Sequence, residues 1–400
     1  AKGKGDELEK TNYFLAEGAN EIELLNSVVL YGANAAGKSN VIKSLQTMKR
    51  IILKSASSQE GDSIEVSPFL FNKDASEEPS EFESIFISEG VRYQYGFSVT
   101  QKQVVEEWLI AYPKGRAQHW FSRVLDKGIP VFKFGDHLLG QKSVWQKATR
   151  SNALLLSTAI QLNSEQLKPV FNWFKEQLQI SSSGDWGAGF TASLCTEKEE
   201  KERILSFLKS ADFDVHDIKI DEKKFNPDHL PDEITGEARK QIIQQLDGRD
   251  LLELNTIHKT AENELVELDF DDESDGTQRF FSLAGPWLDA LKEGLILVID
   301  ELHNGLHPNM VKYLVSLFHD KATNPKNAQL IFTTHETSIL NQEVFRRDQI
   351  WFCEKDEEQA TSLYPLTDFS PRKGKENIEL GYLSGRYGAL PFVKSLNIVW

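Results

Sequence analysis

The sequence predicts an α/β fold with a parallel core sheet, an added antiparallel β part and an inserted helical lobe. Three observations indicate this class. An apolar run near the N-terminus leads into a glycine loop and then a helical pattern, as in a strand–loop–helix unit. Strand-like and then helical segments fill the middle. Near the C-terminus, short apolar runs alternate with helical spacing, which is typical of a parallel sheet.

The N-terminal unit covers residues 21–53. Residues 21–30 end in an apolar run that predicts a buried strand, and residues 39–53 carry apolar side chains at helical spacing. From residue 69 to residue 139, aromatic and β-branched segments separated by glycines predict a run of antiparallel strands. Within that run, the acidic stretch 74–83 predicts a solvated loop.

Changes in periodicity divide the rest of the chain. In the middle, helices are predicted over 152–162, 164–178, 198–210 and 237–246. Towards the C-terminus, strands are predicted over 295–299, 328–333 and 349–352, and helices over 308–320 and 338–345. We expect the two ends of the chain to build one sheet. The predicted parts are therefore an N-terminal half over 1–142, an inserted helical lobe over 143–260 and a C-terminal half over 261–400.

The composition excludes several classes of protein. The chain has 400 residues, of which 40% are hydrophobic and 26% are charged, so disorder, a collagen helix and a disulfide scaffold do not describe the whole. The net charge of −16 gives no global attraction for nucleic acid. The only two cysteines, Cys195 and Cys353, are far apart in the sequence, which favours a reducing compartment. No apolar run approaches the roughly 18 residues of a membrane helix, and we expect a cytoplasmic protein without a membrane partner.

A glycine-rich loop between the first predicted strand and helix is the strongest motif. Its residues match G-x4-G-K-[ST]: Gly32, Ala33, Asn34, Ala35, Ala36, Gly37, Lys38 and Ser39. In this pattern backbone amides wrap phosphates, Lys38 supplies a charge for the β- and γ-phosphates, and the Ser39 hydroxyl can ligate Mg²⁺. The next helix points its positive dipole end at the same place. An ordinary glycine turn before a helix is the alternative interpretation.

Two carboxylates and a histidine stand at the ends of predicted C-terminal strands. The apolar run 295–299 leads directly into Asp300 and Glu301. At the end of a buried strand, Asp300 can hold Mg²⁺ and Glu301 can act as a general base on an attacking water. His335 closes the next strand, where it can hydrogen-bond a γ-phosphate or that water. Each group alone also fits a structural role, but downstream of a phosphate loop they predict one catalytic site.

A third candidate site precedes the helix predicted over 280–291. Ser274 is a good helix N-cap, and Gly276 allows close backbone approach. Ser274, Gly276 and Thr277 allow two interpretations. One is simply a capped helix, and the other is a second phosphate-binding helix start that is presented to a nucleotide held by another copy. Five carboxylates crowd this point: Asp269, Asp271, Asp272, Glu273 and Asp275. Since a helix dipole favours acids near its start, most should form a solvated face, with one or two as alternative contacts to Mg²⁺.

The order of these motifs resembles the ABC-type ATPase heads of the SMC class. Shorter pieces narrow the resemblance to prokaryotic AAA15/AAA21-type ATPases: 32–40 (GANAAGKSN), 275–279 (DGTQR), 302–308 (LHNGLHP), 346–352 (RRDQIWF) and 385–392 (GRYGALPF). These are ATP-binding proteins of abortive-infection and restriction-linked loci, of the RloA and AbiL kind, with relatives in the OLD, Septu and PARIS antiphage systems. The resemblance implies a P-loop NTPase of ABC-ATPase head type.

The resemblance also implies residue roles. Gly32 to Asn40 would bind ATP, and Ser39 and Asp300 would hold Mg²⁺. The implied catalytic residues are Lys38, Glu301 as the base and His335 as the switch histidine. Ser274, Gly276 and Thr277 would act in trans across a homo-oligomer. The sequence departs from the transporter pattern at His303, where an Asp is common.

Three functions compete on this basis. The first is a Mg-dependent, dimerising ATPase that acts as the sensor or regulatory subunit of an antiphage defence system and controls a separate effector, a nuclease or a toxin. The second is an SMC-like ATPase that clamps DNA in repair or chromosome maintenance. The absence of a sustained heptad pattern and the acidic charge weaken it, although a local basic patch could form from Lys223, Lys224, Arg239 and Lys240. The third, a transporter subunit, fits poorly because the stretch from Ser39 to Ser274 is long.

Overall fold

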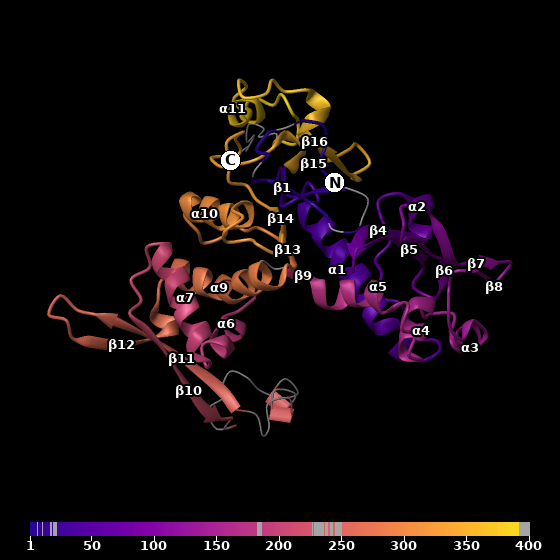
Figure 1. Cartoon of the computed structure of the whole chain (residues 1–400). Coiled ribbons are helices and arrows are strands. Elements are labelled where there is room, and N and C mark those ends of the chain that lie inside the picture. The colour runs from indigo at the N-terminus through magenta and orange to yellow at the C-terminus, as the bar shows by residue number, and fades with distance from the viewer. Residues whose placement is uncertain are drawn as a thin grey trace, which may run out of the picture. The chain divides into compact units, whose positions relative to one another are not determined.

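The computed structural model describes residues 1–5, 7–9, 11–16, 18, 22–181, 186–225, 227, 236, 239–240, 243–244 and 250–391. The chain forms two units (Figure 1). The first comprises residues 1–184, 291–303 and 314–400, and the second comprises residues 185–290 and 304–313. Helices α9 (Asp275–Glu293) and α10 (Pro308–His319) each contribute residues to both units.

A six-stranded sheet is the framework of the first unit, with the strand order β16-β15-β3-β14-β13-β9. Its strands are β3 (Ser27–Gly32), β9 (Leu178–Ser181), β13 (Ile296–Ile299), β14 (Gln329–Thr333), β15 (Ile350–Lys355) and β16 (Thr361–Pro365). All neighbours are parallel except β15 and β16. Since β3 lies between β14 and β15, the prediction that both ends of the chain build one sheet is confirmed. The central strands β3, β13 and β14 consist of the apolar runs seen in the sequence, as expected for strands that a parallel sheet buries on both faces.

Helix α1 (Lys38–Lys54) confirms the first predicted helix and packs its apolar face into the main core. Ile42, Met48 and Ile52 are buried there, together with Val298 of β13 and aromatic side chains from the antiparallel sheet. The phosphate-loop helix, the core sheet and the antiparallel sheet therefore share one hydrophobic core.

The antiparallel sheet holds five strands in sequential order. They are β4 (Ser80–Ser88), β5 (Val91–Val99), β6 (Val104–Tyr112), β7 (Gln118–Asp126) and β8 (Ile129–Phe134). Two hairpins turn through residue pairs with positive φ: Glu89 (49°) with Gly90 (73°), and Lys127 (48°) with Gly128 (82°). Such pairs match the twist of the flanking strands. The predicted antiparallel run is confirmed.

The predicted solvated loop over 74–83 is wrong. Helix α2 (Lys73–Glu77) and the start of β4 occupy it. The Asn72 side chain caps α2 by accepting hydrogen bonds from two backbone amides, and Phe82 packs on the core while its acidic neighbours in β4 face solvent. Alternation along a strand allows acidic residues to sit in it when only one face is buried.

The helices predicted over 152–162 and 164–178 are shorter than expected. They appear as α4 (Leu155–Gln161) and α5 (Lys168–Asn172), which follow α3 (Lys142–Ala148). A further short helix, η1 (Ser55–Ser57), directly follows α1. A π-helical turn, η2 (Trp173–Gln177), follows α5 and leads into β9. There Leu178–Ser181 pairs with Ile296–Ile299. Pairing with a distant strand overrides the local helical spacing here.

The buried carboxylate of Glu107 in β6 connects the antiparallel sheet to α4. It accepts hydrogen bonds from the backbone amides of Leu155 (2.6 Å) and Leu156 (3.0 Å) and from the Tyr95 hydroxyl (3.0 Å). Burial raises the pKa of Glu107, and these donors act in the opposite direction. Because the first amides of a helix lack intrahelical partners, a carboxylate placed there stabilises the helix start. We therefore assign Glu107 a structural role.

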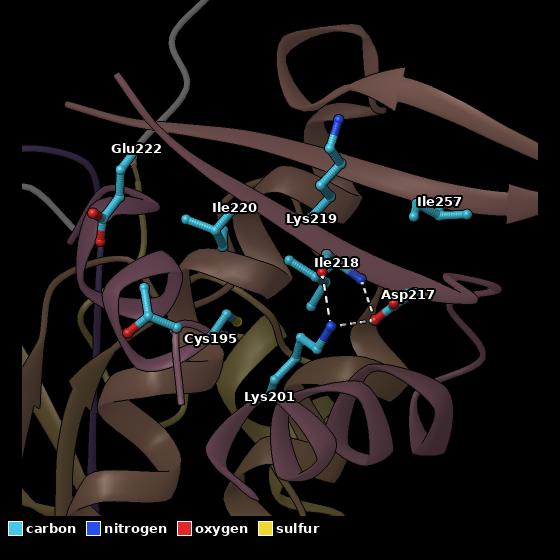
Figure 2. A pocket seen from close by; sticks show the side chains of 9 residues that line it. Cys195, Lys201, Asp217, Ile218, Lys219, Ile220, Glu222 and Ile257 are labelled. Carbon is cyan, nitrogen blue, oxygen red and sulfur yellow. Dashed lines mark hydrogen bonds and ion pairs between the residues drawn. The ribbon is translucent and has the colours of Figure 1, made fainter. Parts of the chain in front are cut away.

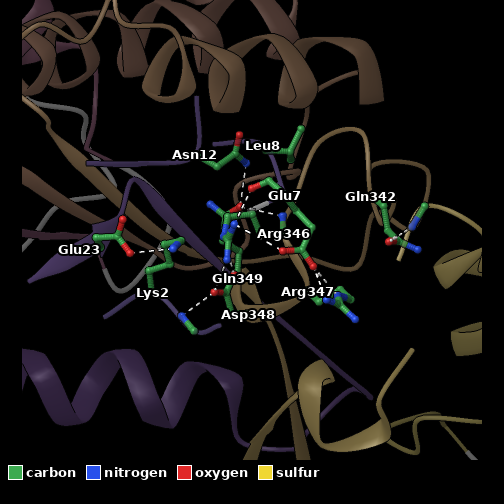
Figure 3. A network of polar contacts seen from close by, with 12 residues as sticks. Lys2, Glu7, Leu8, Asn12, Glu23, Gln342, Arg346, Arg347, Asp348 and Gln349 are labelled. Carbon is green, nitrogen blue, oxygen red and sulfur yellow. Dashed lines mark hydrogen bonds and ion pairs between the residues drawn. The ribbon is translucent and has the colours of Figure 1, made fainter. Parts of the chain in front are cut away.

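Buried polar contacts connect the N-terminal segment to the C-terminal part of the first unit (Figure 3). Strands β1 (Tyr13–Leu15) and β2 (Glu23–Leu25) form an antiparallel pair. The Arg346 guanidinium makes two hydrogen bonds of 2.9 Å to the carboxylate of Asp348 and also donates to the carbonyl oxygen of Glu7. The Glu7 carboxylate pairs with Arg347. Such bidentate, buried contacts hold one specific arrangement.

The helix predicted over 338–345 is wrong. These residues form turns, and η5 (Arg347–Gln349) then leads into β15. The Asn341 side-chain oxygen accepts hydrogen bonds of 3.0 Å from the amides of Glu343 and Val344, which competes with the helical ladder. Beyond β16 the chain continues through η6 (Leu366–Phe369) and α11 (Ile378–Leu383).

The second unit combines helices with a three-stranded antiparallel sheet. Its elements are α6 (Gly189–Leu194), α7 (Lys198–Ser210), β10 (Asp217–Lys224), β11 (Asp250–Lys259), β12 (Leu265–Asp269), η4 (Phe270–Asp272) and the first part of α9. Helix α7 confirms the helix predicted over 198–210, whereas the sheet β10-β11-β12 was not predicted. Phe280 of α9 stacks between Phe207 (4.9 Å) and Phe213 (4.8 Å) in its core.

Two further predictions concern this part of the chain. Most of the helix predicted over 237–246 lies outside the described residues. Residues 143–181 belong to the first unit, while the predicted domain boundaries at 142 and 260 stay predictions. No helix among the described residues is both long enough and apolar enough to cross a membrane.

Candidate active site

The predicted phosphate loop joins the end of β3 to the start of α1, the context that its pattern requires. Ala35 and Gly37 have positive φ angles of 61° and 103°, so the backbone curls as in loops that bind anions through amides. A Cβ added to Gly37 would lie 2.0 Å from the Thr361 hydroxyl, and one added to Gly32 would lie 2.6 Å from the carbonyl oxygen of Cys353. Side chains at these two glycines would collide with β16 and β15.

The other loop residues differ in exposure. Asn34, Ala35 and Asn40 are exposed, Ala33 and Ser39 are half-buried, and Ala36 is buried. The loop therefore presents Asn34 and Ala35 to solvent, and Asn40 is exposed on the helix that follows.

Lys38 is the first residue of α1, and its ammonium group lies within the loop. Nζ donates to the carbonyl oxygens of Gly32 (2.9 Å) and Ala33 (3.0 Å), and the residue is only 5% exposed. Burial lowers the pKa of Lys38, and the carboxylates of Glu301 and Asp300 act in the opposite direction. A lysine held in this way is a fixed point charge, which suits the predicted phosphate contact.

Thr333, at the end of β14, holds the turn that carries Asp300 and Glu301. Its hydroxyl donates to Oδ1 of Asp300 (2.6 Å) and accepts from the amide of Glu301 (2.7 Å). Its carbonyl oxygen accepts from the amide of Leu302 (3.1 Å). Asp300 and Thr333 are buried, and Glu301 has a positive φ of 52°. One threonine thus orients the Asp300 carboxylate and fixes the backbone from which Glu301 projects.

Sequence reasoning missed Thr333. The available signal was a pair of polar residues, Thr333 and Thr334, which end an otherwise apolar strand just before His335. A polar residue buried in a central strand needs a hydrogen-bond partner, and here that partner is the predicted Mg²⁺ ligand.

His335 lies two residues beyond the end of β14, whose neighbours in the sheet are β3 and β13. Because parallel strands end at the same edge of a sheet, the phosphate loop, the two carboxylates and His335 meet at that edge. The His335 ring packs edge-on against His303, with centroids 5.5 Å apart and an interplanar angle of 79°. Burial lowers the pKa of both histidines. Lys38 acts in the same direction, and the carboxylates of Glu301 and Asp300 act in the opposite direction without reversing the shift. The site thus favours neutral imidazoles, which can accept a hydrogen bond.

Ser274, Gly276 and Thr277 lie in the second unit, at the start of α9. The Ser274 side chain accepts a hydrogen bond of 3.2 Å from the amide of Thr277 and lies 2.9 Å from its hydroxyl, which is N-cap geometry. A Cβ added to Gly276 would have ordinary contacts, the nearest at 3.4 Å to the carbonyl oxygen of Gly305. The packing among the described residues therefore does not require glycine at this helix start, where Ser274 is exposed, Gly276 is half-buried and Thr277 is buried.

A pocket of about 440 Å³ lies elsewhere in the second unit, between α7 and the sheet (Figure 2). Lys201 on its wall pairs with Asp217 at 2.9 Å, and Lys219 pairs with Glu267 at 2.8 Å. Since both lysines are already neutralised by carboxylates, the pocket does not offer the charge that a triphosphate needs.

Ser39 and Asp300 provide the hard oxygen donors that Mg²⁺ prefers. Among the described residues, no group of three or more His, Cys, Asp and Glu side chains could hold a metal by itself. Mg²⁺ commonly binds through one or two protein oxygens together with waters and phosphate oxygens. The donor set therefore fits Mg²⁺ bound together with a nucleotide.

Comparison with known proteins gives one family match. Residues 27–341 match the AAA_21 family, described as "AAA domain, putative AbiEii toxin, Type IV TA system". No curated protein matches the chain significantly.

Similar solved structures include the SMC head domain from Thermotoga maritima, with 12% identity, a TM-score of 0.37, and coverage of 88% of this chain and 97% of that chain. Another is the SmcHead bound to the C-winged helix domain of ScpA, with 11% identity, a TM-score of 0.34, and coverage of 89% and 96%.

Proposed function

Since the chain belongs to this AAA-domain family, matched over residues 27–341, we propose that it is a Mg-dependent ABC-type ATPase that binds and hydrolyses ATP. The observation that carries the proposal is the meeting of three groups at one edge of the core sheet. These are the loop with buried Lys38 after β3, Asp300 with Glu301 after β13, and His335 after β14.

Each group has a distinct role in the proposed reaction. The loop amides and Lys38 bind and orient the phosphates. Mg²⁺, held by Ser39 and Asp300, would neutralise charge on the phosphate oxygens. Glu301 takes a proton from the attacking water, and neutral His335 accepts or donates a hydrogen bond at the transferred phosphoryl group.

The nucleotide also joins two copies of the chain in this proposal. Ser274, Gly276 and Thr277 would contact the phosphates of ATP held by a partner copy. The support is local. Ser274 is exposed at the positive end of α9, and the packing that the described part of the chain shows does not require glycine at position 276. Because the N-terminus of a helix attracts anions, this helix start is a suitable site for the phosphates of a nucleotide that a partner copy brings to it.

In the cell, we propose that the ATPase is the sensor or regulatory subunit of an antiphage defence system and controls a separate nuclease or toxin. The family description, "AAA domain, putative AbiEii toxin, Type IV TA system", supports a role in a toxin-linked system. The DNA-clamp alternative has less support, because Lys223 of the predicted basic patch pairs with Glu253.

We propose that the effector contacts an exposed patch of the middle lobe, over about residues 143–254, or the aromatic C-terminal tail. The apolar side chains of the lobe are mostly core, since Leu167, Val170, Ile204 and Leu208 are fully buried. Leu162 is an exception, at 40% exposed. The tail over 392–400 lies outside the described residues.

Purification from the intact native locus tests this role. We expect the chain to co-purify with a neighbouring effector protein and to dimerise when ATP is added, as sedimentation velocity would show. Ser274→Ala should bind ATP as a monomer but fail to dimerise. A chain that purifies alone and binds DNA tightly, with an affinity that falls steeply as salt rises, would instead establish the clamp function.

Thr333→Val tests the geometry of the hydrolytic site. The variant keeps the shape of the side chain but leaves Asp300 without its donor and the Glu301 amide without its acceptor. A hydrogen bond to a charged group contributes about 1.5–3 kcal/mol, so hydrolysis should fall roughly 10- to 150-fold. Phosphate-release assays measure this. Thr333→Ser retains the hydroxyl and should retain most activity, and equal rates in all three proteins would contradict the assigned role.

A further inference from the structure

One of the five carboxylates around the start of α9 differs from the other four. Asp269, Asp271, Asp272 and Asp275 are exposed, as the predicted solvated face requires. The Glu273 side chain, in contrast, is only 8% exposed. A buried carboxylate needs donors to offset the loss of water, so its partners indicate what it does.

Two partners of the Glu273 carboxylate among the described residues come from strand β11. Its Oε1 atom accepts a hydrogen bond of 2.5 Å from the Thr256 hydroxyl and lies 2.6 Å from Nε2 of His258. Thr256 is itself buried. These contacts join the residue immediately before Ser274 to the three-stranded sheet.

The His258 ring has an acceptor at each nitrogen. Nδ1 donates to the carbonyl oxygen of Asp214 at 2.9 Å, because a carbonyl oxygen can only accept. Nε2 faces the Glu273 carboxylate, so a proton must lie between them, either on an imidazolium or on the carboxyl group. In both cases the contact is a strong, charge-assisted or proton-sharing hydrogen bond. Glu273 is therefore held on a ring that is itself fixed from the opposite side.

The helix holds the same turn from its other side. The Gln278 side chain donates to the carbonyl oxygens of Asp271 (3.1 Å) and Glu273 (3.0 Å). The Gln278 amide donates to the carbonyl oxygen of Ser274 at 2.9 Å. The backbone from Asp271 to Ser274 is thus fixed to α9 through Gln278 and to β11 through Glu273.

We propose that Glu273, with Thr256 and His258 as its donors, is a positioning residue that sets the Ser274 hydroxyl and the first amides of α9 for the nucleotide of a partner copy. This inference rests on the proposed trans role of Ser274. Glu273 does not contact the nucleotide. It acts by fixing the turn, and a displacement of about 1 Å in a positioned group can cost roughly 100-fold in rate.

The test compares Glu273→Ala and Glu273→Gln with the matched control Asp272→Ala, which removes an exposed neighbouring acid. For Glu273→Ala we expect unchanged ATP affinity of the monomer, weaker ATP-driven dimerisation and a kcat lowered about 10- to 100-fold. Glu273→Gln should recover much of the loss, since its carboxamide can still hydrogen-bond the Thr256 hydroxyl and Nε2 of His258. Asp272→Ala should match the wild type. General destabilisation of the fold would not lower kcat while leaving ATP affinity unchanged. It would also not be reversed by glutamine at position 273.

The outcomes separate this inference from the proposed function. If Ser274→Ala dimerises and hydrolyses ATP like the wild type, the trans role itself fails. If Ser274→Ala loses both while Glu273→Ala retains the wild-type kcat, the positioning role of Glu273 is overturned. An equal loss in Asp272→Ala also overturns it, because net charge would then be the cause. Should Glu273→Ala not fold, Thr256→Val removes a single donor and should show a smaller loss in the same direction, and a wild-type kcat in that variant overturns the inference.

Discussion

Glu301→Gln is expected to bind ATP with wild-type affinity and to hydrolyse it at least about 100-fold more slowly, because glutamine keeps the shape of glutamate but cannot take a proton from water. The backbone should not move, since the turn is held through the Glu301 amide, which donates to Thr333. Phosphate release and titration with a fluorescent ATP analogue measure the two quantities. Because the bound ATP is not consumed, the variant should also accumulate as a nucleotide-bound dimer on gel filtration.

Glu336→Gln is the matched control for that experiment. Glu336 follows His335, and its side chain accepts a hydrogen bond of 3.0 Å from the amide of Ser338, so this contact survives in the amide. We expect near wild-type hydrolysis. If Glu301→Gln hydrolyses ATP without loss, the general base lies elsewhere, and His335 is the next candidate at that sheet edge.

Lys38→Ala should abolish tight ATP binding while the fold persists. The variant removes the buried ammonium group within the loop, and with it the proposed charged contact to the β- and γ-phosphates. A charge-assisted hydrogen bond contributes about 1.5–3 kcal/mol, which corresponds to a loss of roughly 10- to 150-fold in affinity for each such contact. Isothermal titration measures the affinity, and near-UV circular dichroism checks the fold.

Lys43→Ala controls for the loss of a positive charge on the same helix. Lys43 is an exposed residue of α1, and its removal should leave ATP affinity unchanged. If Lys38→Ala binds ATP as well as Lys43→Ala does, the glycine loop is not a nucleotide site, and the alternative of an ordinary turn before a helix is correct.

The sequence alone determined the features whose chemistry is local. The G-x4-G-K-[ST] spacing, the strand before it and the helix after it lie within one short segment, so the loop and the role of its glycines could be predicted. The apolar runs before Asp300 and His335 predicted that these residues follow the ends of buried strands. A strand of a parallel sheet is buried on both faces, so its sequence is a nearly continuous apolar run. The N-cap at Ser274 is likewise a contact between neighbours in the chain.

Only the tertiary structure decided which residues support these groups. Thr333 reaches Asp300 because β13 and β14 are paired, and β9 exists because its residues pair with a strand more than a hundred positions away. Glu273 looks like one solvated acid among five until β11 brings Thr256 and His258 to it. Such contacts depend on which distant segments become neighbours. Periodicity reports which face of an element is buried, but it does not report what lies against that face.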